Sequence, residues 1–191
     1  MNYAYLIGDA DTSVCAAVDP GWKAEKIKSI ADELGWKIEK ILLTHAHFDH
    51  ANSLMDLVGL TGAPVYLHKD EPCEIPRSIS TSTTEDGSVI DIGTLKVRCL
   101  HTPGHTQGSQ CFLIGNAVIT GDTLFVDGCG RVDLPGSDPK EMLVSLHRLA
   151  GLAPEIIVYP GHNYGHAPTS TIGEQLEMNP YLKANSEDML L

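Results

Sequence analysis

Four apolar segments of this chain each end in a turn that carries histidine or aspartate, and this repeated layout constrains the fold more than any other feature. The segments read "ILLTHAHFDH" (41–50), "VRCLHTPGHTQGS" (97–109), "AVITGDTLF" (117–125) and "IIVYPGHNYG" (156–165). In open α/β sheets, ligands collect at the carboxyl ends of strands. We therefore expect four strand ends at one sheet edge to deliver these side chains to one place.

The remaining segments predict an alternation of short strands and amphipathic helices. Apolar residues at helical spacing predict helices over 23–35, 51–60, 140–152 and 171–178, the third capped by Ser137 or Asp138. Short apolar runs predict strands over 3–7, 14–18, 37–44, 64–68, 89–92, 95–101, 110–114, 117–120 and 155–160. Residues 69–88 and 121–139 read as loops, the first a candidate lid. Hairpins and β-to-α crossovers in one chain favour a layered α/β or α+β fold with mixed sheets.

Composition narrows the class of protein. A length of 191 residues predicts one domain, 1–191, with a short helical tail at about 171–191. The net charge of −12 argues against nucleic-acid and anionic-membrane partners. No apolar run is long enough to span a bilayer and the N-terminus lacks a signal-peptide pattern, so we expect a cytoplasmic protein. Five scattered cysteines without a CxxC pair predict no disulfide framework. The composition does not predict an oligomeric state.

The stretch "HAHFDH" (45–50) is the densest of the four strand-end motifs. His45 and His47 lie two positions apart in an extended segment, so their side chains point the same way and can hold one metal ion. Asp49 and His50 come after the bend and can face a second ion. Imidazole and carboxylate ligands suit zinc, iron or manganese. An HxH pair alone is often no site, but the three matching strand ends make coincidence a poor explanation.

The motifs "THAHFDH", "HTPGHT", "TGDTLF" and "PGHNYG" resemble, in order and position, those of the metallo-β-lactamase superfamily. The resemblance covers nearly the whole chain. It implies a four-layer αββα sandwich of two mixed β-sheets, with a metal site at one edge of the two sheets. Carried over by motif, the first metal would bind His45, His47 and His105, and the second Asp49, His50 and His162. Asp122 would bridge the two ions, which the resemblance implies are most often zinc.

Within that superfamily, "GDTLFVDGCGR" (121–131) resembles the loop of glyoxalase II, the hydroxyacylglutathione hydrolases. The resemblance implies hydrolysis of a thioester by a hydroxide that bridges two metal ions, with Asp49 as a catalytic residue that orients the hydroxide's proton. Only 29 residues follow His162, fewer than the helical glutathione-binding domain of that family needs. Asp133 also replaces a tyrosine common there. The compact, single-domain glyoxalase-II-like hydrolases are therefore the closer likeness. The chain begins at what resembles the family's second strand, so we expect an edge strand to be missing.

An alternative is the persulfide dioxygenase branch of the same fold. Its loop and tail resemble "GCGRVDL" (128–134) and "STIGEQLEMNP" (170–180). That resemblance implies one iron ion, held by His45, His105 and Asp122, and glutathione persulfide as the substrate. We favour thioester hydrolysis because "GDTLF" is more similar to the hydrolases. A non-enzymatic binding module is a third alternative, but the complete ligand set disfavours it.

Several residues outside the ligand set have two interpretations each. Arg131 could clamp a substrate carboxylate or form an ion pair with Asp127 or Asp133. Cys129 reads as a packed residue rather than a nucleophile. Tyr164 could reach into the cleft and bind substrate or pack against its own loop. Of the other histidines, His147 reads as structural or solvated, and His101, at a strand end, could support a metal ligand.

Overall fold

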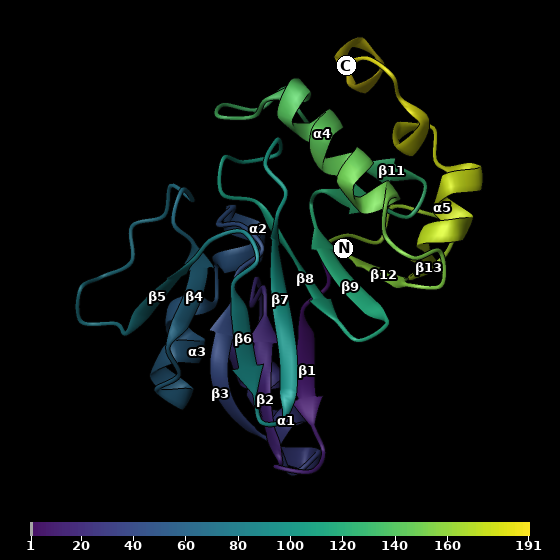
Figure 1. Ribbon diagram of the computed structural model, residues 1–191. Helices are drawn as coiled ribbons and strands as arrows, with labels where there is room; N and C mark the ends of the chain where they lie inside the picture. The colour runs from purple at the N-terminus through teal and green to yellow at the C-terminus, as the bar shows by residue number, and fades with distance from the viewer. Residues whose placement is uncertain (1) are drawn as a thin grey trace.

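The computed structural model describes residues 2–191, in which two β-sheets pack face to face with helices on their outer sides (Figure 1). The order of the first sheet is β1 (Tyr5–Asp9), β2 (Val14–Val18), β3 (Lys37–Leu42), β4 (Val65–His68) and β5 (Thr81–Thr84). The pair β1–β2 is antiparallel, whereas the strands from β2 to β5 pair in parallel. The sheet is therefore mixed, as predicted.

The second sheet is mixed as well and supplies three of the four motif-bearing strands. Its order is β13 (Ser170–Thr171), β12 (Ile157–Pro160), β9 (Ala117–Gly121), β8 (Gln110–Ile114), β7 (Leu95–His101) and β6 (Val89–Ile92). Only β9 and β12 pair in parallel; the other neighbours are antiparallel. Because β7 and β9 flank β8, the strands β7, β9 and β12 all run in one direction. Their carboxyl ends consequently meet at one edge.

The inner faces of the two sheets form the central core. Leu42 of the first sheet and Phe112 of the second are fully buried there. Alternate positions along the strands supply the remaining buried side chains, as expected where only one face of a strand turns inward. These are Ile7, Ala16, Val18, Ile90, Ile92, Val97, Cys99 and Ile119. Burial of a side chain the size of Phe112 contributes about 1.5–3 kcal/mol, so this layer fixes the sheets against each other.

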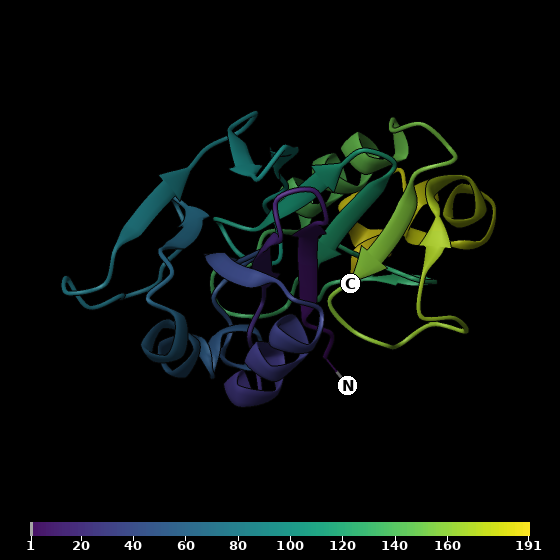
Figure 2. The same cartoon turned by 90° about the horizontal axis from the view of Figure 1, so that it is seen from below.

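Helices cover both outer faces and complete a four-layer αββα arrangement. Helices α1 (Ala24–Glu33) and α3 (Leu54–Thr61) pack on the first sheet. On the second sheet lie α4 (Pro139–Ala150), α5 (Ile172–Met178) and the short turns η1 (Tyr181–Lys183) and η2 (Glu187–Leu190). Figure 2 shows the strands between these two helical groups. The predicted fold class is confirmed.

Two sequence-based element predictions were wrong. The segment 69–88 is not a continuous loop, because Thr81–Thr84 forms strand β5 and pairs in parallel with β4. The side chains of β5 all carry hydroxyl groups and show no apolar alternation, so the strand can be recognised only by its pairing with β4. The loop 121–139 likewise contains a short hairpin of β10 (Leu124–Phe125) and β11 (Gly128–Cys129).

The predicted helix 51–60 is divided. Helix α2 (Phe48–Ala51) comes first and α3 follows after a break at Asn52 and Ser53. The Ser53 amide donates to the carbonyl of Pro20, 3.0 Å away, instead of continuing a helix. The break lets α2 present ligand-type residues while α3 buries its apolar face.

The start of α4 follows the predicted cap, and the start of α5 has a cap that was not predicted. Asp138 caps α4 by accepting hydrogen bonds from the amides of Lys140 and Glu141, and Pro139 occupies the first turn. Thr171 and Glu174 form a capping box at the start of α5.

Two predictions from composition can be compared with residues 2–191. None of the helices in this range combines the length and apolar character that a bilayer-spanning segment needs. The five cysteines, all within the described range, are free thiols.

A buried carboxylate closes the end of the sandwich that carries the β1–β2 and β6–β7 turns. Asp9 accepts hydrogen bonds from the Thr94 amide (2.6 Å), the Thr12 hydroxyl (2.8 Å) and the Asp11 amide (3.0 Å). The Thr94 amide and then the Thr12 hydroxyl lower the pKa of Asp9 from 3.8 to about 2. The ionised form is therefore favoured in the folded state.

We predict that Asp9→Asn lowers the free energy of unfolding at neutral pH. Because the pKa of Asp9 is lower in the folded state, its contribution is complete above about pH 4 and is lost as the pH falls toward about 2. Denaturant unfolding of metal-free wild type and variant should therefore show a difference that shrinks over this range. A difference independent of pH would contradict the assignment.

Candidate metal centre

The structure brings all seven predicted ligand residues together at one edge of the sandwich. His45 and His47 follow β3, and Asp49 and His50 lie in α2. His105, Asp122 and His162 follow β7, β9 and β12, in that order. Since β3 belongs to the first sheet, the prediction that all four strand ends share one sheet edge was wrong. The site lies across both sheets, as the family resemblance implied.

The first group consists of His45, His47 and His105. The Nδ1 atom of His47 lies 2.8 Å from Nε2 of His105. The ring centres of His45 and His105 are 4.9 Å apart. Two histidine nitrogens on one tetrahedral zinc are separated by about 3.3 Å, given Zn–N bonds of about 2.0–2.1 Å. The three rings thus converge as ligands of a single ion would.

The second group consists of Asp49, His50 and His162. Nε2 of His162 is 3.2 Å from Nε2 of His50 and 3.5 Å from a carboxylate oxygen of Asp49. Asp122 lies between the two groups. Its carboxylate oxygens are 3.1 Å from Nε2 of His162, 3.2 Å from Nε2 of His50 and 3.6 Å from Nε2 of His105. One carboxylate therefore reaches both groups.

Hydrogen bonds behind the rings leave the inward-facing nitrogens available. Thr44 donates its hydroxyl to Asp19 at 2.6 Å, so its oxygen accepts from Nδ1 of His45 at 3.1 Å. Nε2 of His45 is buried and has no hydrogen-bond partner among residues 2–191. A buried polar atom is costly unless it is paired, and a metal ion would pair this one. The residues present therefore fit a divalent cation.

Two further imidazoles are oriented in the same way. His105 donates from Nδ1 to the backbone carbonyl of Arg131 at 2.8 Å, which leaves Nε2 as the ligand atom. Nδ1 of His50 faces a carboxylate oxygen of Asp19 at 3.1 Å. Asp19 has a left-handed backbone, with φ of 50°, and its buried side chain serves both Thr44 and His50.

Burial and charge act differently on the members of the site. Burial, followed by the neighbouring His50, lowers the pKa of His45 well below its usual value, so its ring is neutral. Burial also lowers the pKa of His105. For His50, burial disfavours protonation, but hydrogen bonds to Asp122 and Asp19 outweigh it and raise its pKa to about 10. Burial likewise opposes ionisation of Asp122, yet hydrogen bonds from His162 and His50 keep its pKa well below the usual range.

The centre opens to solvent on the side of His47 and Asp49, which are half-buried while the other five are buried. Phe48 lies between these two in the chain, is 68% exposed and contacts Trp22 edge to face at 5.6 Å. Tyr164 is 65% exposed and stacks on His162, with ring centres 4.7 Å apart. The exposed ring of Tyr164 therefore lies directly against a ligand-type side chain.

The structure shows the surroundings of Arg131, Cys129 and His147, for each of which the sequence left two interpretations. Arg131 forms a two-pronged ion pair with Asp133, at 2.8 Å for both contacts, on the surface. This is the contact that the ion-pair interpretation predicts, while the role of Arg131 as a substrate clamp stays a prediction. Burial raises the pKa of the Cys129 thiol to about 12, which suits a packed residue. His147 donates from Nε2 to the carbonyl of Ala184 at 2.8 Å and is structural.

Sequence reasoning missed three residues that support the site. Asn2 donates its amide to the Asp49 carboxylate at 2.7 Å and to its backbone carbonyl at 2.9 Å. Asp19 begins the turn sequence "DPGW" (19–22), outside the four motifs, although it follows an apolar strand as the predicted ligands do. Glu71 lies in a segment without periodicity, and no sequence signal identifies it.

One more cluster of ligand-type residues, His68, Asp70 and His101, lies outside the centre. The rings of His68 and His101 stack face to face, 3.8 Å apart at 9°. Ring-nitrogen lone pairs lie in the ring planes, so those of parallel rings do not converge on one ion. His101 instead donates from Nε2 to the carbonyl of Gln107 at 2.9 Å and stabilises the loop that carries His105.

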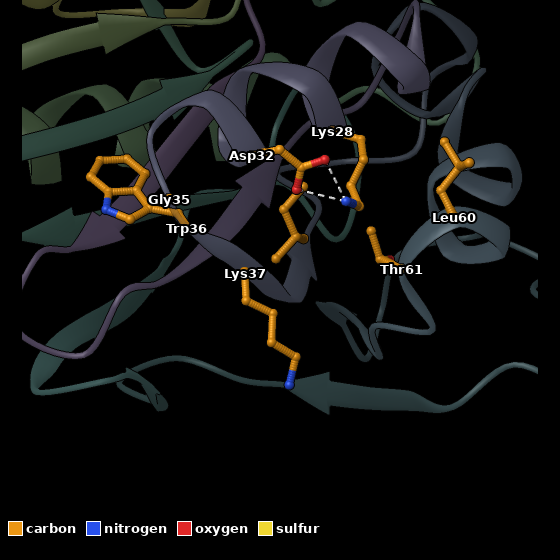
Figure 3. Close-up of a pocket in the computed structure, with 8 residues that line it drawn as sticks. Lys28, Asp32, Gly35, Trp36, Lys37, Leu60 and Thr61 are labelled. Carbon is orange, nitrogen blue, oxygen red and sulfur yellow. Dashed lines mark hydrogen bonds and ion pairs between the residues drawn. The ribbon is translucent and has the colours of Figure 1, made fainter.

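The hollow drawn in Figure 3 is also unrelated to the metal centre. It has a volume of about 350 Å³. Its lining includes Trp36 and Lys37, at the start of β3, whereas the histidines follow the end of that strand. Lys28 and Asp32 neutralise each other across it at 2.7 Å.

Comparisons with known proteins identify relatives of this chain. The sequence profile of the Metallo-beta-lactamase superfamily matches residues 1–162. A protein of Bacillus subtilis (strain 168), named a probable polyketide biosynthesis zinc-dependent hydrolase, PksB, is 35% identical over 98% of this chain and 84% of its own length. A hydroxyacylglutathione hydrolase of Maricaulis maris is 42% identical over 87% of this chain and 64% of its own. The solved structure of ETHE1 from Myxococcus xanthus has a TM-score of 0.87 and 31% identity, and covers 99% of this chain and 83% of that one.

Two glycines of the "GCG" loop provide a matched test of the site geometry. A Cβ at Gly130 would lie 1.8 Å from the backbone oxygen of Asp122 and 3.3 Å from the His105 ring, whereas one at Gly128 would meet only Phe125, at 3.7 Å. We predict that Gly130→Ala weakens metal binding by about tenfold or more, because the displaced groups flank the ligands. Gly128→Ala should bind metal as wild type does. Metal content after dialysis against a chelator measures both, and equal retention would contradict the geometry.

Proposed function

The chain belongs to the metallo-beta-lactamase superfamily, and on that premise we propose that it hydrolyses an acyl thioester, such as a hydroxyacylglutathione, with two divalent metal ions. One observation carries the proposal: two groups of three ligand-type residues share the carboxylate of Asp122. That arrangement suits a pair of ions that act on one substrate. The relative named as zinc-dependent supports zinc as the metal.

We assign the ligand roles as the motifs implied. His45, His47 and His105 would hold one ion, Asp49, His50 and His162 the other, and Asp122 both. When bound, the ions would lower the pKa of a coordinated water and polarise the carbonyl oxygen of the substrate. The neutral rings of His45 and His105 and the ionised Asp122 are already in the protonation states that ligands require. His50, whose pKa is raised to about 10 by Asp122 and Asp19, would have to lose its proton when the ion binds.

Asp49 is suited to handle the proton of the attacking water. Its side chain is 41% exposed, against 10% for Asp122, so it meets solvent and substrate. Asn2 donates to one of its oxygens and fixes its orientation. The free oxygen can accept a proton at the open side of the centre, so we assign Asp49 a catalytic role.

Tyr164 is the better of the two predicted substrate-binding residues. Its exposed ring stacks on His162 and offers apolar surface beside that ligand. Arg131 would have to leave Asp133 to reach a substrate. We therefore propose that a small acyl thioester lies against the Tyr164 ring. The net charge of −12 remains the reason to expect neither nucleic acid nor an anionic membrane as a partner.

The alternative function is the mononuclear-iron persulfide dioxygenase reaction, with glutathione persulfide as the substrate. The similarity to the ETHE1 structure covers almost the whole chain and fits this alternative as well as it fits the hydrolase. His45, His105 and Asp122, the three ligands that it needs, lie in the same centre. The hydrolase is preferred because the two relatives described above, at 35% and 42% identity, are both named hydrolases.

A paired assay separates the two functions. We expect protein purified without chelator to contain about two divalent ions per chain and to hydrolyse S-lactoylglutathione. It should consume no oxygen with glutathione persulfide. Asp122→Ala should lose metal and activity together. A single iron ion with persulfide-dependent oxygen uptake and no thioester turnover would favour the dioxygenase instead.

The role of Tyr164 can be tested with two substitutions. We predict that Tyr164→Ala raises KM by about five- to tenfold with little change in kcat, because a lost aromatic contact is worth about 1 kcal/mol. Tyr164→Phe keeps the ring and should stay near wild type. Steady-state kinetics measure both variants, and a fall confined to kcat would rule out a binding role.

A further inference from the structure

Glu71 is a buried carboxylate in the loop between β4 and β5 that the reaction above does not use. Its side chain lies next to the metal centre and is held by two segments that are far from it in sequence. Oε1 accepts a hydrogen bond from the Ala46 amide at 2.7 Å, and Oε2 accepts one from the Thr106 hydroxyl, also at 2.7 Å. Ala46 separates His45 from His47, and Thr106 follows His105. One carboxylate therefore contacts both loops that carry the first group of histidines.

The backbone of Glu71 is itself fixed. Its amide donates to the carbonyl of His68 at 3.0 Å, and its carbonyl accepts from the amide of Cys73 at 2.8 Å. Gly108 packs against it so closely that a Cβ there would lie 2.4 Å from the Glu71 Cα. The carboxylate is thus positioned from a rigid base rather than from a mobile loop.

The hydrogen bonds around Thr106 give the contact a defined direction. The Thr106 amide donates to the Ser109 hydroxyl oxygen at 3.0 Å, so Ser109 donates its own proton to Thr106 Oγ1 at 2.7 Å. The Thr106 hydroxyl proton is then free for Glu71. Both oxygens of Glu71 accept, as an ionised carboxylate requires.

Glu71 is only 8% exposed, and no lysine, arginine or histidine among residues 2–191 forms an ion pair with it. Burying an ionised group without a counter-ion is costly unless hydrogen bonds compensate. Here the Ala46 amide and the Thr106 hydroxyl supply that compensation, one to each oxygen. The two oxygens lie at a fixed separation, so the carboxylate holds the two donors at a fixed separation as well.

We propose that Glu71 is a positioning residue for the first metal: its carboxylate sets the distance between the His45–His47 loop and the His105 loop. This inference rests on the metal-dependent reaction proposed above. His47 and His105 approach to 2.8 Å across these loops, so a shift of either loop would separate the ligand atoms. In the second group, His162 lies on neither loop that Glu71 contacts. Asp49 and His50 belong to the 45–50 stretch, but the amide that Glu71 binds, that of Ala46, lies between the two histidines of the first group.

The test is a zinc titration, read by competition with a chromophoric chelator, with zinc alone and no substrate. Glu71→Ala is made in a His162→Ala background, which retains the first group, and in a His47→Ala background, which retains the second. We expect zinc affinity to fall by about ten- to a hundredfold in the first background. It should change by less than about threefold in the second.

Two matched variants separate positioning from general loss of structure. Asp9→Asn removes another buried carboxylate at the far end of the sandwich, and it should lower stability without changing zinc affinity. Glu71→Gln should restore most of the affinity, because its amide can accept from Ala46 and donate to Thr106, whose proton can turn to Ser109. Denaturant unfolding of each variant supplies the stability scale.

Several outcomes would overturn the proposal. Equal losses in both backgrounds, an equal loss in Asp9→Asn, or no loss in Glu71→Ala would each show that Glu71 is merely structural. A loss in Glu71→Gln as large as in Glu71→Ala would show that charge, rather than hydrogen-bond geometry, matters. Because no substrate is present, a failed thioester assay would remove the proposed reaction without affecting this result.

Discussion

Burying imidazole rings at the open edge of a β-sandwich costs free energy unless each ring nitrogen finds a partner, and the rest of this site depends on how that cost is met. The Nδ1 atoms of His45, His50 and His105 are paired behind the rings, with Thr44, Asp19 and the Arg131 carbonyl in that order. The Nε2 atoms of these three rings are thereby left to face the interior of the centre. Metal ions would satisfy these atoms, so metal affinity and the local fold would share the same free energy.

Carboxylates provide the long-range connections. Asp19 joins the end of β2 to Thr44 and His50, while Asp122 reaches both ligand groups from the end of β9. Glu71 performs the comparable role for the loops after β3 and β7. Each carboxylate thus fixes elements that are far apart in sequence. The packed core between the two sheets, centred on Leu42 and Phe112, fixes their relative position so that these contacts can form.

Much of the architecture could be predicted because the spacing of apolar residues and the composition of a segment are local properties of the sequence. The strand runs and the amphipathic helix 140–152 are visible in the sequence, as is the cap at Asp138. Strand β5 could not be predicted, because Thr81–Thr84 has no apolar face and exists only through pairing with β4. The split of helix 51–60 was also hidden, because it depends on where α2 must turn its polar residues.

For the candidate site, the sequence by itself determined which residue types stand at the strand ends. The histidines and aspartates follow apolar runs, and the family resemblance of these motifs named the seven residues that the structure brings together. Only the tertiary structure decided which other residues position these side chains through hydrogen bonds. Asn2, Asp19 and Glu71 act through contacts over 25 or more positions, and Arg131 pairs with Asp133 at the surface. These contacts depend on how the two sheets pack against each other. No local pattern in the chain encodes which distant residues that packing brings together.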